Sequence, residues 1–318
     1  MTQPPGMRCN AAPSGGCSLT VDDGEAIATS IPMSERETPK PSPSPPQRSD
    51  APPQDGDAPT GIAICLIPPT RRLLLALIWG ALCHGTFLLG VGAMVIGMGF
   101  GMTLGQGPLT GAWGWVVNGL LLLQFPVLHS LLLSGKGQQA LHRLAPWGTG
   151  RTLATTTYVT IAGAQLLLLF GLWSPSGTVW WQAQGGLLWL WLAAYSSAWA
   201  LLGKAMLDAG LSVQAGWLGW TALLRNHRPQ FPPMPTRGLF RVIRQPIYAT
   251  FALTLWTVPV WTPDQLFVAS SLTLYCLIGP LFKERRFARL FGSAFEHYRA
   301  RTPYWVPWSR PKSDDRIP

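Results

Sequence analysis

Long apolar runs separated by short polar or basic segments dominate the chain after its first seventy residues. At about 20 residues per bilayer crossing, each long run can form one membrane-spanning helix. The first four expected spans cover about Leu73 to Phe100, Trp113 to Leu133, Leu153 to Trp173 and Gly185 to Met206. The first is dense in glycine, which we interpret as close helix packing through small residues.

Two further apolar runs form a hairpin near the C-terminus. The fifth begins near Pro246 and ends near Trp261, and a sixth reaches Phe282 after the turn at 262–264. The fifth run is short for a full crossing, so a tilted or half-buried hairpin remains open. The pattern predicts an all-α integral membrane bundle of about six spans with a C-terminal helical hairpin.

The basic residues alternate along these spans. Lys and Arg are missing from three of the connecting stretches, 101–112, 174–184 and 257–263. They occur in the alternate stretches, at 71–72, 136–151, 225–244 and 283–301. Since basic loops stay inside, we expect a multi-pass protein of the inner membrane with both termini cytoplasmic.

Composition narrows the functional class. The chain has 318 residues, of which 12% are charged, against roughly 25% in soluble domains. The net charge of +10 comes from residues between spans, so it indicates topology rather than nucleic-acid binding. Five cysteines without metal-ligand spacing and four carboxylates between Arg71 and Ser313 predict no metal site.

The chain divides by composition into three parts. Residues 1–70 are rich in Pro, Ser and Gly, and such a segment cannot bury enough apolar surface to offset its ordering entropy. We expect 1–70 to be a disordered cytoplasmic tail, 71–308 a transmembrane domain and 309–318 a flexible tail.

Two polar residues lie inside the second expected span. Asn118 and His129 are eleven positions apart, which places them on one face of a helix. Polar groups at membrane depth either hydrogen-bond neighbouring helices or serve a site. Both are candidates for binding a substrate, whereas Gln165 in the third span is interpreted as a packing residue.

The segment before the hairpin is basic. Arg237, Arg241 and Arg244 would share one face if it were helical. Pro246 suits the first turn of the next helix and biases Gln245 away from helical geometry. We expect a bend at the membrane surface, facing Glu284 beyond the hairpin. The simpler interpretation is that the arginines mark the inner face and Glu284 pairs with them.

Residues 234–308 resemble the C-terminal region of the isoprenylcysteine carboxyl methyltransferase superfamily. Its pattern is Arg-His-Pro-x-Tyr-x-Gly, a helical hairpin, Glu-Glu, then Phe-Gly-x-x-Tyr-x-x-Tyr. Here 244–250 read Arg-Gln-Pro-Ile-Tyr-Ala-Thr, 283–284 read Lys-Glu, and 291–298 read Phe-Gly-Ser-Ala-Phe-Glu-His-Tyr. The chain is similar to the branch with methanethiol S-methyltransferase-like and NnrU-like proteins over residues 71–308. It departs from the pattern at Gln245, Thr250 and Lys283.

The resemblance implies a cytoplasmic site for S-adenosylmethionine. Arg244 and Glu284 are the implied catalytic residues. The implied cofactor-binding set is Arg241, Arg244, Gln245, Pro246, Tyr248, Glu284 and Tyr298. Methyl transfer needs alignment and exclusion of water more than a strong acid or base, which suits a site poor in carboxylates.

The predicted function is S-adenosylmethionine-dependent methyl transfer to an apolar or small thiol, carboxyl or amine acceptor, with the lipid bilayer as the other partner. One alternative is a non-catalytic membrane protein with a relict cofactor pocket. Another is a membrane reductase of the sterol reductase type. The sequence leaves the acceptor and the oligomeric state open.

Overall fold

A computed structural model of the protein describes residues 68–307. Both predicted tails lie outside this range, except for residues 68–70 of the first. Those parts of the domain prediction therefore stay predictions.

The described residues are mainly helical. In chain order the helices are α2 (Pro69–Gly99), α3 (Gly111–Leu132), α4 (Gly135–Leu144), α5 (Gly150–Gly171), α6 (Gly185–Asp208), α7 (Leu211–Gln214), α8 (Trp217–Leu224), α9 (Leu239–Val242), α10 (Pro246–Trp256), α11 (Pro263–Phe291) and α12 (Ser293–Arg301). Two short strands, β1 (Trp181–Gln182) and β2 (Val260–Trp261), pair antiparallel, with Trp181 opposite Trp261.

The all-α membrane fold is confirmed. Five described helices, α2, α3, α5, α6 and α11, are long and apolar enough to cross a membrane. The fifth predicted segment is α10, which has 11 residues and spans only about 16 Å at 1.5 Å per residue. A hydrocarbon core is about 30 Å thick, so α10 does not cross alone. The short length of α10 agrees with the sequence analysis, which found the fifth run too short for a full crossing.

The long helices leave many large apolar side chains uncovered. Leu88, Leu89, Trp189 and Leu190 are each more than 60% exposed. On a water-facing surface such a density of apolar side chains would be unfavourable, whereas lipid chains cover it at no cost. The exposed apolar surface therefore agrees with a multi-pass membrane protein.

Helices α2 and α5 pack closely through glycine. A Cβ added to Gly90 would lie 2.4 Å from the backbone oxygen of Gly163, and one added to Gly163 would lie 2.7 Å from the backbone of Thr86. Only residues without a side chain allow the two backbones to approach this closely. The glycine density of the first span has the packing role that the sequence predicted.

The end of the bundle that carries β1 and β2 is tied together by polar contacts. The Trp173 indole donates to Asp264 Oδ1 at 2.9 Å, and the Ser176 backbone N–H donates to Oδ2 at 3.0 Å. Thr262 caps α11 by accepting from the Gln265 N–H at 2.9 Å, a cap that begins the helix. These contacts fix the turn between α10 and α11.

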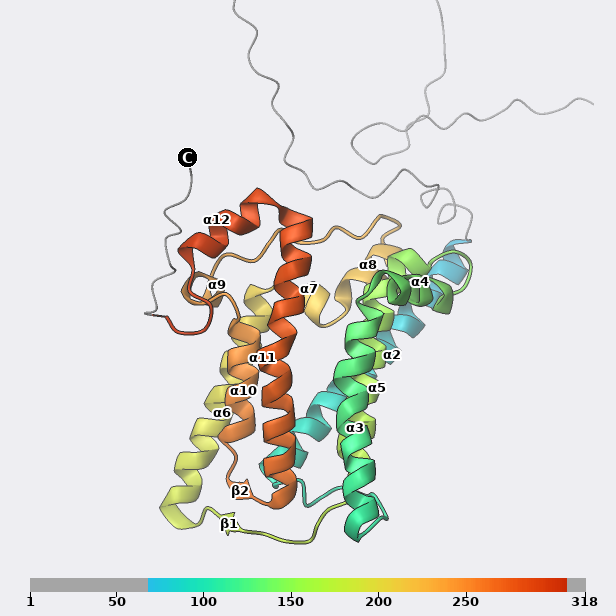
Figure 1. The fold of residues 1–318 in the computed structure, drawn as a ribbon. Helices are drawn as coiled ribbons and strands as arrows, with labels where there is room; N and C mark the ends of the chain where they lie inside the picture. The colour runs from blue at the N-terminus through green and yellow to red at the C-terminus, as the bar shows by residue number, and fades with distance from the viewer. Residues whose placement is uncertain (1–67, 308–318) are drawn as a thin grey trace, which may run out of the picture. The chain divides into compact units, whose positions relative to one another are not determined.

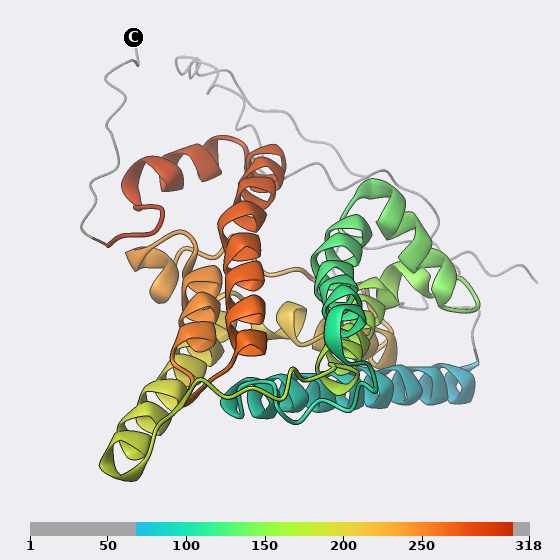
Figure 2. The ribbon, with the colours of Figure 1, turned by 60° about the horizontal axis from the view of Figure 1, so that its bottom comes forward.

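Helix α10 lies between α6 and α11, as both ribbon views show (Figures 1 and 2). At the other end of the long helices from β1 and β2 lie α4, α8 and α12 (Figure 1). Most of the described basic residues belong to this second end, in agreement with the charge alternation of the sequence.

The shared helical face of three arginines is not formed. Helix α9 contains only four residues, Leu239–Val242. Gly238 precedes it with φ +60°, and Ile243 ends it in extended geometry at φ −142°. Arg237 and Arg244 therefore lie outside the helix. The helix is interrupted at Gly238 and at Ile243, so the three arginines do not share a face. The spacing of the arginines did not reveal these two interruptions.

Candidate functional site

The predicted bend before α10 is present and directs one side chain inward. Pro246 is the first residue of α10, and Gln245 precedes it with φ −120° and ψ 48°. Pro has no N–H to lose at this position. Gln245 is only 1% exposed, so its amide must find partners inside the protein.

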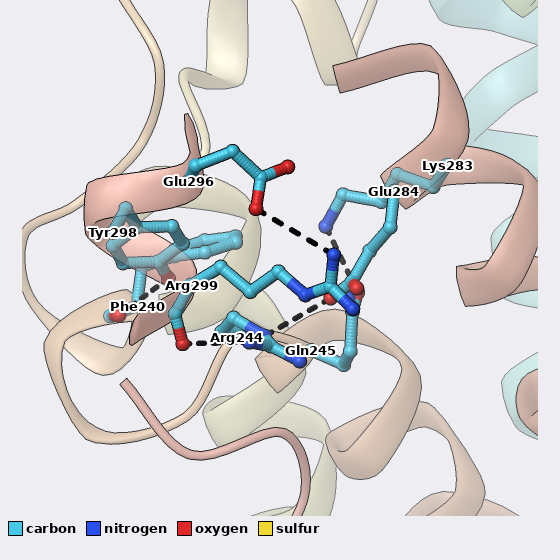
Figure 3. Close-up of polar contacts among 8 residues, drawn as sticks. All are labelled: Phe240, Arg244, Gln245, Lys283, Glu284, Glu296, Tyr298 and Arg299. Carbon is cyan, nitrogen blue, oxygen red and sulfur yellow. Dashed lines mark hydrogen bonds and ion pairs between the residues drawn. The ribbon is translucent and has the colours of Figure 1, made fainter. Parts of the chain in front are cut away.

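Those partners come from the C-terminal part of α11. Gln245 Nε2 donates to Glu284 Oε1 at 2.8 Å, and Gln245 Oε1 accepts from Lys283 Nζ at 3.1 Å (Figure 3). The amide satisfies a carboxylate and an ammonium at once, which uses both of its polar ends. Two of the departures from the superfamily pattern, Gln245 and Lys283, are therefore in direct contact.

Arg244 lies on the other side of Glu284. Its Nε is 3.0 Å from Glu284 Oε1, and its Nη1 donates to the backbone oxygen of Arg299 at 2.9 Å (Figure 3). The distance from Nε to Glu284 is that of an ion pair. The geometry is not that of a hydrogen bond, so the buried Nε–H has no hydrogen-bond acceptor among the described residues. The guanidinium also lies 5.1 Å from the Tyr304 ring centre. Arg244 thus has unused donor capacity.

Helix α12 forms the wall opposite α11. The Tyr298 hydroxyl donates to the backbone oxygen of Phe240 at 2.7 Å (Figure 3). Burial raises the pKa of Tyr298 above its ordinary value, so this phenol stays protonated and remains a donor. The contact joins α12 to α9.

Lys283 reaches into a group of aromatic rings. Its Nζ lies 5.3 Å from the ring centre of Phe240, 5.9 Å from that of Tyr248 and 5.2 Å from that of Phe287. All three distances are within the range of cation–π attraction. The ammonium is held by ring faces as well as by Gln245.

These side chains line one small pocket. Its lining residues are Pro235, Phe240, Arg244, Gln245, Lys283, Glu284, Phe287, Phe295 and Tyr298. The empty volume is about 220 Å³, open mouth included. Because that volume includes open solvent, the enclosed space is smaller still and lies below the roughly 300–1,000 Å³ of sites for small molecules. A ligand the size of a nucleoside therefore requires a wider pocket than this one.

A second polar cluster lies between α3 and α5. Tyr158 OH and His129 Nε2 are 2.5 Å apart, and the His129 ring stacks on Phe125 at 5.2 Å. His129 Nδ1 is buried without a hydrogen-bond partner among the described residues. A polar atom left unpaired inside a membrane protein is costly, so this nitrogen is a candidate for binding a ligand.

A row of rings joins this cluster to the pocket. Phe125 contacts Tyr275 at 6.5 Å between ring centres, and Tyr275 contacts Tyr248 at 6.3 Å. Tyr248 is also one of the rings around Lys283. The two polar clusters are thus the ends of one aromatic row that crosses from α3 to α10.

Comparison with known proteins gives relatives of a single kind. Methanethiol S-methyltransferase 1 of Bradyrhizobium diazoefficiens is 31% identical over 199 residues, covering 61% of this chain and 67% of that protein. Methanethiol S-methyltransferase 2 of the same organism is 28% identical over 207 residues, covering 63% and 77%. The methanethiol S-methyltransferase of Mycobacterium tuberculosis is 27% identical over 214 residues, covering 61% and 78%.

The chain belongs to the methanethiol S-methyltransferase family. This family is a branch of the isoprenylcysteine carboxyl methyltransferase-like membrane superfamily, so the predicted resemblance is confirmed. No family model matches the chain. No solved structure matches it either.

The predicted cofactor residues of the family pattern are only partly brought together. Arg244, Gln245, Glu284 and Tyr298 line the pocket. Pro246 is buried and begins α10, and Tyr248 contributes a ring beside Lys283. Arg241 is exposed and does not line the pocket, because the extended residue after α9 turns the chain.

Asn118 and His129, the two residues predicted to bind a substrate, lie far apart in the structure. Asn118 Nδ2 donates to the Ser174 backbone oxygen at 2.8 Å, and Asn118 Oδ1 accepts from the Ser174 N–H at 2.9 Å. Eleven residues of helix place Asn118 about 16 Å from His129 along α3. Asn118 therefore ties α3 to the loop after α5. Gln165 donates to Gln124 Oε1 at 2.8 Å, in agreement with a packing role.

The sequence analysis did not assign several residues that the structure places in these clusters. Phe240, Phe287 and Phe295 line the pocket, and Tyr158 contacts His129. The spacing of Lys283 and Phe287, four residues apart on one helix face, was a usable signal. No local signal marks Tyr158, which lies 29 residues from His129.

The pocket residues fit S-adenosylmethionine in kind. Its amino-acid end needs partners of both signs, and the Glu284 carboxylate and the Arg244 guanidinium are groups of both signs. Phe240 and Phe287 supply ring faces for a sulfonium or an adenine. The fit requires the pocket to widen beyond its present volume.

Proposed function

We propose that this protein is a multi-pass membrane methyltransferase that uses S-adenosylmethionine and methylates a small thiol. The observation that carries the proposal is the contact of Arg244 and Gln245 with Glu284 across the α10–α11 hairpin. Membership of a family whose named relatives are methanethiol S-methyltransferases supports it.

The residues on the donor side would bind and orient. When bound, S-adenosylmethionine supplies an electrophilic methyl group on a sulfonium centre. Arg244 would hold the carboxylate of the donor through its guanidinium, and Glu284 would accept from its ammonium. Gln245, fixed by its two contacts, would keep Glu284 in place. Positioning of this kind is the main requirement of methyl transfer.

The acceptor side would be the His129 cluster. A thiol must lose its proton as its sulfur bonds to the methyl carbon, while the bond from that carbon to the donor sulfur would break and leave a neutral thioether. With Nε2–H donating to the Tyr158 oxygen, His129 Nδ1 is a free acceptor that would take this proton. The aromatic row from Phe125 to Tyr248 would exclude water from the path between the two clusters. Its rings suit a small apolar thiol.

A non-catalytic protein with a relict pocket is the second candidate. The presence of the Lys283 ammonium inside the pocket favours it, because a cation there opposes a positively charged donor. The relatives named above are methyltransferases, which favours methyl transfer over the reductase alternative.

Binding and turnover test the proposal. The purified full chain in lipid nanodiscs is titrated calorimetrically with S-adenosylmethionine and with S-adenosylhomocysteine. Methanethiol is then supplied, and dimethyl sulfide is measured in the headspace. We expect binding of at least one nucleoside and methylation of the thiol. A folded protein that binds neither ligand at millimolar concentration overturns the proposal, and binding without turnover of any thiol supports the relict pocket.

A further inference from the structure

The ammonium of Lys283 has an unusual set of neighbours. Three ring centres, those of Phe240, Tyr248 and Phe287, lie 5.2 to 5.9 Å from Nζ. An ammonium has three N–H donors. Within residues 68–307, the Lys283 ammonium makes one hydrogen bond, to Gln245 Oε1 at 3.1 Å. Ring faces take the place of the other acceptors.

Such a set of rings is better suited to another kind of cation. Aromatic cages bind quaternary ammonium groups, which attract ring faces but have no N–H to donate. A sulfonium has the same property. The cage belongs to the pocket of Arg244 and Glu284, since Phe240, Lys283 and Phe287 all line it. The lysine thus fills a place whose chemistry suits a sulfonium.

We propose that Lys283 acts as an internal cation in the sulfonium subsite, so that the pocket prefers the neutral demethylated nucleoside, S-adenosylhomocysteine, over the charged methyl donor. The inference rests on the proposed function, because it assigns part of the same pocket. It makes Lys283 a specificity-determining residue of this chain.

The physical cause is repulsion between like charges. Two positive charges about 5 Å apart, at an effective dielectric constant near 20, change a binding constant by more than tenfold. The donor carries the sulfonium charge and the product does not, while the two molecules otherwise differ only by the methyl group. Binding of the donor therefore requires the ammonium to leave the cage and give up its ring contacts.

A purely structural role for Lys283 is distinguishable. A lysine that only balances the charge of Glu284 would affect both nucleosides alike, since both carry the same amino-acid end. Only a cation beside the sulfonium changes the ratio of the two dissociation constants. The ratio is also insensitive to the fraction of protein that is folded.

The experiment measures Kd for S-adenosylmethionine and S-adenosylhomocysteine by calorimetry in nanodiscs. The variants are Lys283→Met, Lys283→Gln and Lys283→Arg. Arg285→Met is the control, because Arg285 is exposed and lies outside the pocket lining. We expect the ratio of donor Kd to product Kd to fall at least tenfold in the two neutral variants. Lys283→Arg and Arg285→Met should keep the wild-type ratio.

Two outcomes overturn the inference in different ways. Binding of both nucleosides with an unchanged ratio in Lys283→Met and Lys283→Gln refutes it and leaves the proposed function standing. Failure of the wild type and of both neutral variants to bind either nucleoside refutes the proposed function, and the inference with it. Thermal unfolding of each variant shows that the protein compared is folded.

Discussion

Glu284 is the one carboxylate among the residues that line the described pocket. It contacts Arg244 at 3.0 Å and Gln245 at 2.8 Å, and its side chain is 16% exposed. A partly buried ion pair adds little net stability, but removing one partner leaves the other charge uncompensated. Glu284 therefore affects both folding and ligand binding.

We expect Glu284→Gln to weaken nucleoside binding by about 1.5–3 kcal/mol, the range for a charge-assisted hydrogen bond. The free energy of unfolding should fall by on the order of 2 kcal/mol. Calorimetry and chemical denaturation measure the two effects. The matched control is Glu296→Gln, since Glu296 pairs with Arg299 at 3.6 Å on an exposed surface. Equal losses in both variants would contradict the assignment of Glu284 to the site.

Tyr158 gives a test of the acceptor side at the same scale. Tyr158→Phe removes the partner of His129 Nε2 and with it the group that orients the imidazole. We expect kcat/KM for the thiol to fall at least about tenfold, which is less than the roughly 10²–10⁴-fold contribution of general acid–base catalysis itself, because the base is misoriented and not removed. The Kd for S-adenosylmethionine should stay unchanged. The control is Tyr195→Phe. It also removes a tyrosine hydroxyl, which donates to Val95 O at 2.8 Å, but this hydroxyl belongs to neither cluster. An unchanged kcat/KM in Tyr158→Phe would remove His129 from the mechanism.

Among the elements, α2 and α5 make the closest helix contact that glycine permits. We expect Gly90→Ala to destabilise the protein by about 1–3 kcal/mol, the cost of overpacking, because its Cβ would lie 2.4 Å from Gly163 O. Gly92→Ala in the same helix meets nothing within 4 Å and should be neutral or slightly stabilising. Denaturation in detergent measures the difference. Equal stability of the two variants would mean that the helices do not pack here.

The short helix α9 depends on its junction with α6. Asp208 pairs with Lys204 and accepts from the Leu239 N–H at 2.8 Å. Gly238, at φ +60°, leaves no room for a Cβ, which would lie 2.2 Å from Asp208 Oδ2. This junction holds Phe240 in the wall of the pocket.

We expect Gly238→Ala to weaken nucleoside binding more than tenfold and to lower stability by at least about 1–3 kcal/mol, the cost of a strained backbone. Gly203→Ala in α6 meets nothing within 4 Å and should leave both quantities near the wild-type values. Calorimetry and denaturation apply again. A Gly238→Ala protein with normal binding would show that α9 does not shape the pocket.

At the scale of the whole molecule, the basic residues predict orientation. Reporter fusions after residues 108, 178 and 262 should report the outer side of the membrane, and fusions after 145, 230 and 300 the inner side. The first three positions lie within the stretches without Lys or Arg, and the others lie among the basic segments. An inner-side signal after residue 178 would contradict this topology and the cytoplasmic placement of the pocket.

The sequence by itself determined the spans and the bend. The helices α2, α3, α5 and α6 begin and end within a few residues of the predicted limits. The length of an apolar run can be counted in the sequence, and the thickness of the bilayer sets the length that a spanning helix needs. Pro246 likewise fixed the start of α10, since its ring restricts its own backbone and that of Gln245.

Only the tertiary structure decided which side chains meet. Gln245 and Lys283 are 38 residues apart, and Tyr158 and His129 are 29 apart, so their contacts depend on how whole helices pack. Asn118 and His129 share a helix face yet serve different ends of the bundle. Arg244 lines the pocket and Arg241 does not, because the extended residue between them, Ile243, changes the direction of the chain. Spacing specifies a face, whereas the neighbours of that face are set by the rest of the fold.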